Sequence, residues 1–176
     1  MNNKILKTET QDLHDRIERV MNAHLLFSNR FTAAHYQNFI VKSYCYVTGV
    51  ISSRGSDWPQ FEDILIQKQR ALLVDLKQMD IDFAQYPPVV VDASDKHYRL
   101  GLIYIVLGAM LGNKMILNKL REYDSFEGYT FAYLSEHQEQ LTSIWKSFQV
   151  LNNQLDASKL DKVIRGARDG YLLFGK

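Results

Sequence analysis

Five histidines are the residues of this sequence best suited to bind a metal, and their spacing limits what they could bind. They are His14, His24, His35, His97 and His137. No two stand three or four residues apart, the spacing that places two imidazoles on one helical face to share a small metal ion. A mononuclear site built from neighbouring histidines is therefore not predicted. A single histidine can still be the axial ligand of a haem, because the porphyrin supplies four nitrogens itself.

His14 stands out because it borders an apolar stripe. Four residues recur at helical spacing and define that stripe: Leu13, Ile17, Val20 and Met21. Each residue turns the helical wheel by about 100°, so His14 lies about 75° from the centre of the stripe. It borders the face that we expect to be buried. Two interpretations stay open: a boundary histidine with a hydrogen bond and no function, or an iron ligand.

Three glycines share one face of the most apolar segment, 101–112. Gly101, Gly108 and Gly112 fall within about 40° of one another on the helical wheel. Each interior glycine costs a helix about 1 kcal/mol relative to alanine, so this face must gain something from close approach. The gain is either tight packing against another helix or a flat ligand lying on exposed backbone, and the spacing does not decide between them.

Other catalytic patterns are weak. Cys45 lies in an aromatic helical stretch, which favours a core residue over a nucleophile. The sequence contains no nucleophile elbow, P-loop, Rossmann glycine fingerprint or Cys-x-x-Cys pair. Glu136, His137 and Glu139 lie close together, but a dimetal carboxylate bundle needs Glu-x-x-His on two helices. Enzyme classes that depend on those motifs are not predicted.

The elements that must position these residues are helices. The chain has 176 residues, of which 46% are apolar and 12% aromatic, which predicts one folded all-α domain over residues 1–176 with about six to eight helices. Thr8 and Gln11 form a possible capping box for the first helix, although that helix could begin earlier, near Lys4. A turn is expected at Ser53–Asp57. The predicted helices cover Thr8–His24, Thr32–Ile51, Gln60–Met79, a long segment from a cap within 92–95 to about Glu122, Thr130–Leu151, and Ala157 to about Phe174.

Charge and cysteine content limit the partners. The formal net charge of +1 does not predict nucleic-acid binding. The apolar segment 101–112 is well short of the roughly 20 residues that a membrane span needs, and the N-terminus lacks a run of signal-peptide length. One cysteine cannot form an internal disulfide, so we expect a soluble protein of the reducing cytoplasm.

Three segments together resemble the biliverdin-producing haem oxygenases, particularly the bacterial branch. Leu6–His14 (LKTETQDLH) is similar to the proximal-helix pattern of that family, which ends in a histidine. Tyr104–Gly112 (YIVLGAMLG) is similar to its glycine-rich distal helix, and Ala167–Tyr171 to its C-terminal pattern. The order of these segments and the length of the chain agree with the family. The resemblance therefore implies an all-α haem oxygenase-like fold.

The resemblance also implies a reaction and roles for particular residues. Haem, as both substrate and cofactor, would be cleaved with O2 to biliverdin, CO and ferrous iron. His14 would be the axial ligand, Gly108 and Gly112 the catalytic floor of the distal side, and four residues would contact haem: Lys7, Lys146, Tyr104 and Asn113. Lys7 and Lys146 would hold the propionates. Electrons would come from a separate reductase or ferredoxin, and a bilin-accepting protein could take the product.

The distal segment departs from the bacterial pattern at three positions. Asn113 replaces the second glycine of a pair, Leu107 an acidic residue and Ala109 a polar one. These changes leave two alternatives to the enzyme: a catalytically silent haem- or tetrapyrrole-binding protein on the same fold, or a helical interaction module without haem. Asn113 either supplies a replacement hydrogen bond or narrows the pocket.

Overall fold

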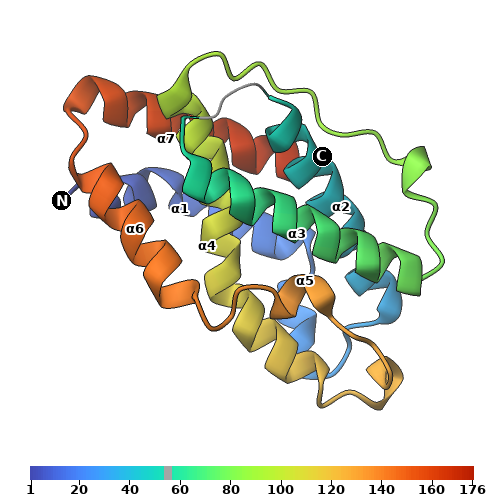
Figure 1. Ribbon diagram of the computed structural model, residues 1–176. Helices are drawn as coiled ribbons and strands as arrows, with labels where there is room; N and C mark the ends of the chain where they lie inside the picture. The colour runs from blue at the N-terminus through green and yellow to red at the C-terminus, as the bar shows by residue number, and fades with distance from the viewer. Residues whose placement is uncertain (54–56) are drawn as a thin grey trace.

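The computed structural model describes residues 1–53 and 57–176, and this part of the chain is entirely helical (Figure 1). It contains seven α-helices and three short 3-10 helices and no strand, which confirms the all-α prediction. The predicted turn at Ser53–Asp57 lies mostly outside the described residues. The helices are α1 (Asn2–Val20), η1 (Ala23–Ser28), α2 (Ala33–Ser52), α3 (Pro59–Gln78), η2 (Phe83–Gln85), α4 (Lys96–Leu120), η3 (Asp124–Phe126), α5 (Ala132–Ser135), α6 (Leu141–Asn153) and α7 (Ala157–Phe174).

Most helix boundaries lie within two residues of the predicted ones, because local caps set them. Thr32 caps α2 by accepting a hydrogen bond from the backbone N–H of His35, and Pro59 occupies the first turn of α3. The capping box at Thr8 and Gln11 is wrong, because α1 begins at Asn2. The amphipathic pattern simply extends further toward the N-terminus than that box allowed.

The single helix predicted over Thr130–Leu151 is also wrong. Side chains of α3 bind the backbone of the first part of this segment, which forms a separate short helix. The carboxylate of Asp75 accepts hydrogen bonds from the backbone N–H groups of Ala132 (2.8 Å) and Tyr133 (2.9 Å). The Lys68 ammonium donates to the carbonyls of Tyr133 (2.9 Å) and Glu136 (2.7 Å). These buried charges fix both ends of the four-residue helix α5, and the chain turns before α6 begins at 141.

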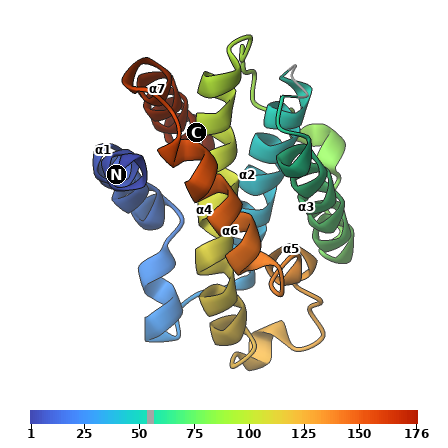
Figure 2. The same ribbon diagram turned by 60° about the vertical axis from the view of Figure 1, so that its left-hand side comes forward.

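Helix α4 runs through the centre of the molecule and organises the other helices around it (Figures 1 and 2). It packs most extensively against α7 and also contacts α2, α5 and α6. In Figure 2, α1 and η1 lie on one side of α4, whereas α2 and α3 lie on the other. At 25 residues α4 is long and apolar enough to cross a membrane, but 56% of its most apolar window is buried inside the protein. That burial is typical of a core helix.

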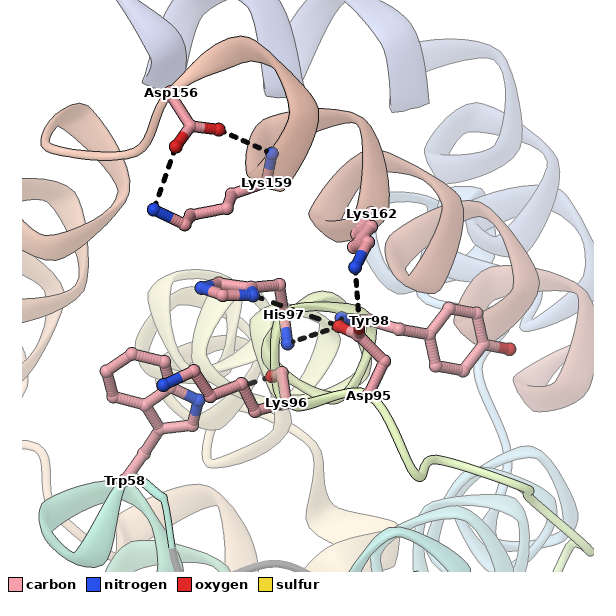
Figure 3. A network of polar contacts seen from close by, with 8 residues as sticks. All are labelled: Trp58, Asp95, Lys96, His97, Tyr98, Asp156, Lys159 and Lys162. Atoms are coloured by element: carbon pink, nitrogen blue, oxygen red, sulfur yellow. Dashed lines mark hydrogen bonds and ion pairs between the residues drawn. The ribbon is translucent and has the colours of Figure 1, made fainter.

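The N-terminal ends of α4 and α7 are joined by a polar network (Figure 3). Asp95 caps α4 by accepting hydrogen bonds from the backbone N–H groups of His97 (2.9 Å) and Tyr98 (3.1 Å). The same carboxylate pairs with Lys162 of α7 at 2.6 Å. These interactions lower the pKa of Asp95 to about 2, with the Lys162 hydrogen bond as the main cause. The network therefore fixes α4 to α7 at one end.

Backbone-to-backbone contact fixes the same two helices one turn further along. A Cβ atom added to Gly101 would lie 2.6 Å from the backbone nitrogen of Ala167 and closer still to the carbonyl oxygen of Val163. A Cβ on Gly166 would likewise collide with the backbone of Tyr98. At Gly101 the packing interpretation of the glycine face is therefore correct.

Candidate functional site: the face between α1 and α4

The histidine predicted to bind iron lies on the exposed side of α1. The side chain of His14 is 47% exposed, and its ring makes an edge-to-face contact with Tyr171 of α7, with 6.1 Å between ring centroids. Its Nδ1 atom lies 3.6 Å from a carboxylate oxygen of Asp15 and 3.8 Å from one of Glu18. Because the two carboxylates gather at Nδ1, Nε2 is the ring nitrogen left for another ligand.

Helix α1 is held in place by α6 and α7. Asn2 donates hydrogen bonds to the carbonyl oxygens of Asn152 (2.8 Å) and Leu155 (2.9 Å) at the end of α6. Arg168 of α7 donates to the carbonyl of Glu9 and to the Asp12 carboxylate. The hydrogen bond from Arg168 to the Asp12 carboxylate lowers the pKa of Asp12. These contacts set the position of α1, and with it that of His14.

Gly108 and Gly112, in the second half of α4, face open space. A Cβ atom added to either glycine would find no atom of another segment within 4 Å. Both residues are partly exposed, whereas residues 104–107, in the turn before Gly108, are buried. The packing interpretation that holds for Gly101 therefore fails here, and the backbone of this face is accessible to a ligand.

The side chains of Tyr104 in α4 and Thr10 in α1 lie close to each other beside this open space. Burial raises the pKa of Tyr104, and the nearby Thr10 side chain opposes that rise. Thr10 is one turn from His14, and Tyr104 is one turn from Gly108. Since a helical turn advances about 5.4 Å, His14 and Gly108 both lie close to the contact. The structure thus brings the two predicted elements of the site together.

A surface groove of about 450 Å³ extends this region toward the C-terminal end of α4. Phe27 of η1 lines it together with Leu111 and Met115 of α4, and all three are unusually exposed apolar side chains. Lys114, Lys119 and Glu122 lie at the same groove, and Lys119 pairs with Glu122 at 2.6 Å. A concave, partly apolar surface of this kind suits a flat apolar ligand.

The remaining predicted haem contacts occupy different environments. Tyr104 is buried and packs against Trp145 of α6, with ring centroids 5.9 Å apart. Lys7 on α1 and Lys146 on α6 are exposed, and neither forms an ion pair within residues 1–53 and 57–176. Both lysines are therefore available to a carboxylate ligand.

Asn113 is turned into the core, unlike the two glycines. Its side chain is 1% exposed and lies, with that of Ser43, beside the hydroxyl of Tyr133. Neither amide atom of Asn113 has a hydrogen-bond partner among the described residues. Met110 is also fully buried. The bulk of both side chains is thus accommodated in the core and leaves the open face free.

Sequence reasoning missed several residues of this region. Glu18 lies four residues after His14, and that spacing on a helix was a usable signal. Tyr171 was noted only as part of a C-terminal pattern, since nothing local indicates that α7 places it edge-to-face with the His14 ring. Phe27 belongs to a 3-10 helix that the periodicity did not predict. Tertiary structure alone places it opposite α4.

Comparisons with known proteins support the fold. No protein-family model matches the sequence, and no curated protein sequence matches it. Among solved structures, the chain is similar to the haem oxygenase of Neisseria meningitidis, whose crystal structures have NO and CO bound. The TM-score is 0.76 at 18% sequence identity, and the match covers 99% of this chain and 88% of that one.

The chain has a haem oxygenase-like fold. The resemblance seen in Leu6–His14 and Tyr104–Gly112 is therefore confirmed at the level of the fold. At 18% identity the match carries over no residue roles. The roles of His14, the two glycines and the other predicted contacts stay predictions that must be argued from the geometry of this chain.

Proposed function

We propose that the protein is a haem oxygenase that uses O2 and reducing equivalents to cleave haem to biliverdin, CO and ferrous iron. One observation carries this proposal. In a haem oxygenase-like fold, the backbone of Gly108 and Gly112 faces open space near the contact that joins α4 to the helix carrying His14. A helix that keeps two glycines on an uncovered face gains nothing from packing there, which favours a ligand.

The residues present suit a haem in three respects. His14 offers an imidazole whose Nε2 is not engaged by the neighbouring carboxylates. Phe27, Leu111 and Met115 offer apolar surface for a macrocycle. Lys7 and Lys146 are exposed cations, available to propionates at the edge. An axial nitrogen, an apolar floor and peripheral cations together form the donor set that a haem requires.

Haem would supply both the iron that activates oxygen and the ring that is oxidised. The protein contributes orientation and access. Asp15 and Glu18 favour the tautomer of His14 that carries its proton on Nδ1, which leaves the Nε2 lone pair as the donor. The edge-to-face contact with Tyr171 would restrict rotation of the His14 ring. Gly108 and Gly112 would leave room for a bound ring that side chains would otherwise fill, and would leave α4 backbone groups accessible to it.

The proposed reaction needs partners from outside this chain. The sequence contains no dinucleotide-binding fingerprint, so the electrons would come from a separate reductase or ferredoxin. A bilin-accepting protein is a further proposed partner for the product. We place this chemistry in the cytoplasm, in keeping with the single free cysteine, Cys45, and we propose no role for nucleic acid or a membrane.

A haem-binding protein without turnover is the second candidate. The observation that favours it is the apolar character of α4 beside the two glycines. Leu107 is buried, Ala109 carries no hydrogen-bonding group, and the amide of Asn113 lies in the core. If turnover depends on a polar side chain over the ring, these residues do not provide one. Haem uptake without degradation would then be the function.

Turnover of the haem complex separates the two candidates. We would form the complex with ferric haem, supply a reductant under air and follow the visible spectrum. If the protein is a haem oxygenase, we expect the Soret band to bleach while a bilin band grows. A complex that keeps its Soret band through repeated reduction would contradict the proposal and establish the silent binder.

A leucine at Gly108 tests the role of the open face. We expect Gly108→Leu to slow the conversion to bilin at least ten-fold while haem uptake falls less, because the added side chain fills the space over the ring. Ala34→Leu is the matched control, since Ala34 is an exposed helical residue of α2. Equal loss of uptake and conversion in Gly108→Leu would argue that this face is structural.

A further inference from the structure

Three potential metal ligands gather on the exposed side of α1. His14, Asp15 and Glu18 each offer one ligand atom, and these three atoms lie within 4.8 Å of one another. All three side chains are about half exposed. Among the described residues, this is the one group of three such ligands. Nδ1 is the nitrogen of His14 that faces both carboxylates, so the group does not use the nitrogen proposed to bind haem.

The spacing suits a small divalent ion. A tetrahedral ion with bonds of about 2.1 Å holds its ligand atoms about 3.4 Å apart. The Nδ1 atom lies 3.6 Å from the Asp15 oxygen and 3.8 Å from the Glu18 oxygen. The two carboxylate oxygens lie within 4.8 Å of each other, and side-chain rotations at these exposed positions would draw all three ligand atoms to that spacing. One imidazole with two carboxylates is a donor set that first-row transition metals such as Zn²⁺ and Fe²⁺ accept.

The charge of the two carboxylates is not neutralised by the surrounding structure. Asp12, on the same helix, pairs with Arg168 at 3.1 Å. Asp15 accepts a hydrogen bond from the neutral Gln11 amide (2.6 Å), and within the described ranges neither Asp15 nor Glu18 forms an ion pair with a lysine or arginine. Two negative charges therefore converge on one imidazole nitrogen, an arrangement that a cation would stabilise.

We propose that His14, Asp15 and Glu18 form a binding site for a divalent first-row transition metal ion, and that this ion and haem compete for His14. The competition rests on the proposed function, whereas the metal site does not. A cation on Nδ1 displaces the ring proton to Nε2, which then has no lone pair for iron unless that proton is lost as well, and the cation adds positive charge beside a ferric iron. The coupling is reciprocal, so haem must weaken metal binding by the same factor. Ferrous iron, which the proposed reaction releases beside His14, belongs to this class of ions.

Calorimetric titration of the haem-free protein with Zn²⁺ tests the metal site directly. We expect one ion per chain, with affinity reduced at least ten-fold in Glu18→Gln and in Asp15→Asn and lost in His14→Ala. Glu9→Gln is the matched control, since it removes one carboxylate from the same helix outside the group. The site is overturned if millimolar Zn²⁺ does not bind, or if the Glu18 and Asp15 variants bind as tightly as the wild type.

A second titration tests the competition. Saturating Zn²⁺ is expected to lower the affinity for ferric haem at least five-fold in the wild type, and this effect should vanish in the Asp15→Asn/Glu18→Gln double variant. Haem affinity that is indifferent to bound Zn²⁺ would overturn the competition and leave the metal site standing. Because the first titration contains no haem, failure of the proposed function and failure of the metal site give different results.

Discussion

The two halves of α4 carry glycines on the same face, but the glycine of one half is tightly packed and those of the other half are open. In the N-terminal half, Gly101 lets the backbone of α7 approach so closely that a Cβ would collide with it. In the C-terminal half, Gly108 and Gly112 meet no atom of another segment, and a groove of about 450 Å³ begins beside them. The spacing of the glycines therefore predicts which face of the helix allows another group to come close to its backbone. The tertiary packing decides whether that face is covered by another helix or left open to a ligand.

The two halves also differ in what holds them. The N-terminal half is fixed by backbone contact with α7 and by the Asp95–Lys162 pair (Figure 3). The C-terminal half packs on α5, which depends on the buried charges of Asp75 and Lys68. The N-terminal half is thus held by close backbone contact and a partly exposed ion pair, and the C-terminal half through buried charges, which predicts that the two halves respond differently to substitution and to pH.

The largest expected effect is at Gly101. Gly101→Ala places a methyl group against the backbone of Val163 and Ala167, so α4 and α7 must move apart. Overpacking of this kind typically costs 1–3 kcal/mol, and a collision with backbone belongs at or above the upper end. We expect a loss of about 3 kcal/mol or more in the free energy of unfolding, measured with urea. A loss below about 1 kcal/mol would contradict the close contact.

A smaller effect, confined to high pH, is expected from Lys68. Burial lowers the pKa of Lys68 to about 8, compared with 10.5 for an ordinary lysine. Between these two values the unfolded chain binds a proton that the folded chain does not, so the free energy of unfolding rises as the pH rises from about 8 to 10.5. Below about 8 both states are protonated, and the burial penalty is present in full.

The Lys68→Met variant isolates this contribution. It lacks the titrating group and leaves the carbonyls of Tyr133 and Glu136 without their donor. We expect the stability difference between wild type and variant to widen by a few kcal/mol from pH 8 to pH 10.5, as measured by urea unfolding at each pH. Parallel pH profiles would show that the pKa of Lys68 is the same in the folded and the unfolded chain, which would contradict its burial as the cause of a shift.

The smallest effect is expected at Gly108. Alanine is a better helix former than glycine by about 1 kcal/mol, and a Cβ at this position meets nothing within 4 Å. Gly108→Ala should therefore leave the free energy of unfolding unchanged or raise it by up to about 1 kcal/mol. A clear destabilisation in thermal or urea unfolding would mean that the face is covered in solution and would remove the contrast with Gly101.

The sequence predicted the fold wherever local chemistry sets the structure. Caps such as Thr32 and Asp95 set helix boundaries, and the patterns around His14 and Gly108 indicated the haem oxygenase-like fold. Prediction failed wherever a distant residue decides the outcome. The break before Leu141 depends on Lys68 and Asp75 in α3, which no periodicity within 130–151 reveals.

In the candidate site, too, the features set by local sequence could be predicted and those set by distant residues could not. Spacing placed Gly108 and Gly112 on one face of a helix, but only the packing shows that the face is open. The side chain of Asn113 was expected near the ligand, because the resemblance aligns it with the second glycine of the distal pair. One further residue turns the helix by about 100°, which is enough to bury its amide beside Tyr133.

Ferric haem titration of the wild type and of His14→Ala tests the central claim, that His14 and the open face of α4 hold a haem, most directly. We expect a sharp Soret change that saturates at one haem per chain in the wild type. His14→Ala should lose that spectrum and bind haem at least ten-fold more weakly, with the spectrum restored by added imidazole. His24→Ala should behave as the wild type. A His14→Ala variant with the native spectrum and affinity would contradict the account.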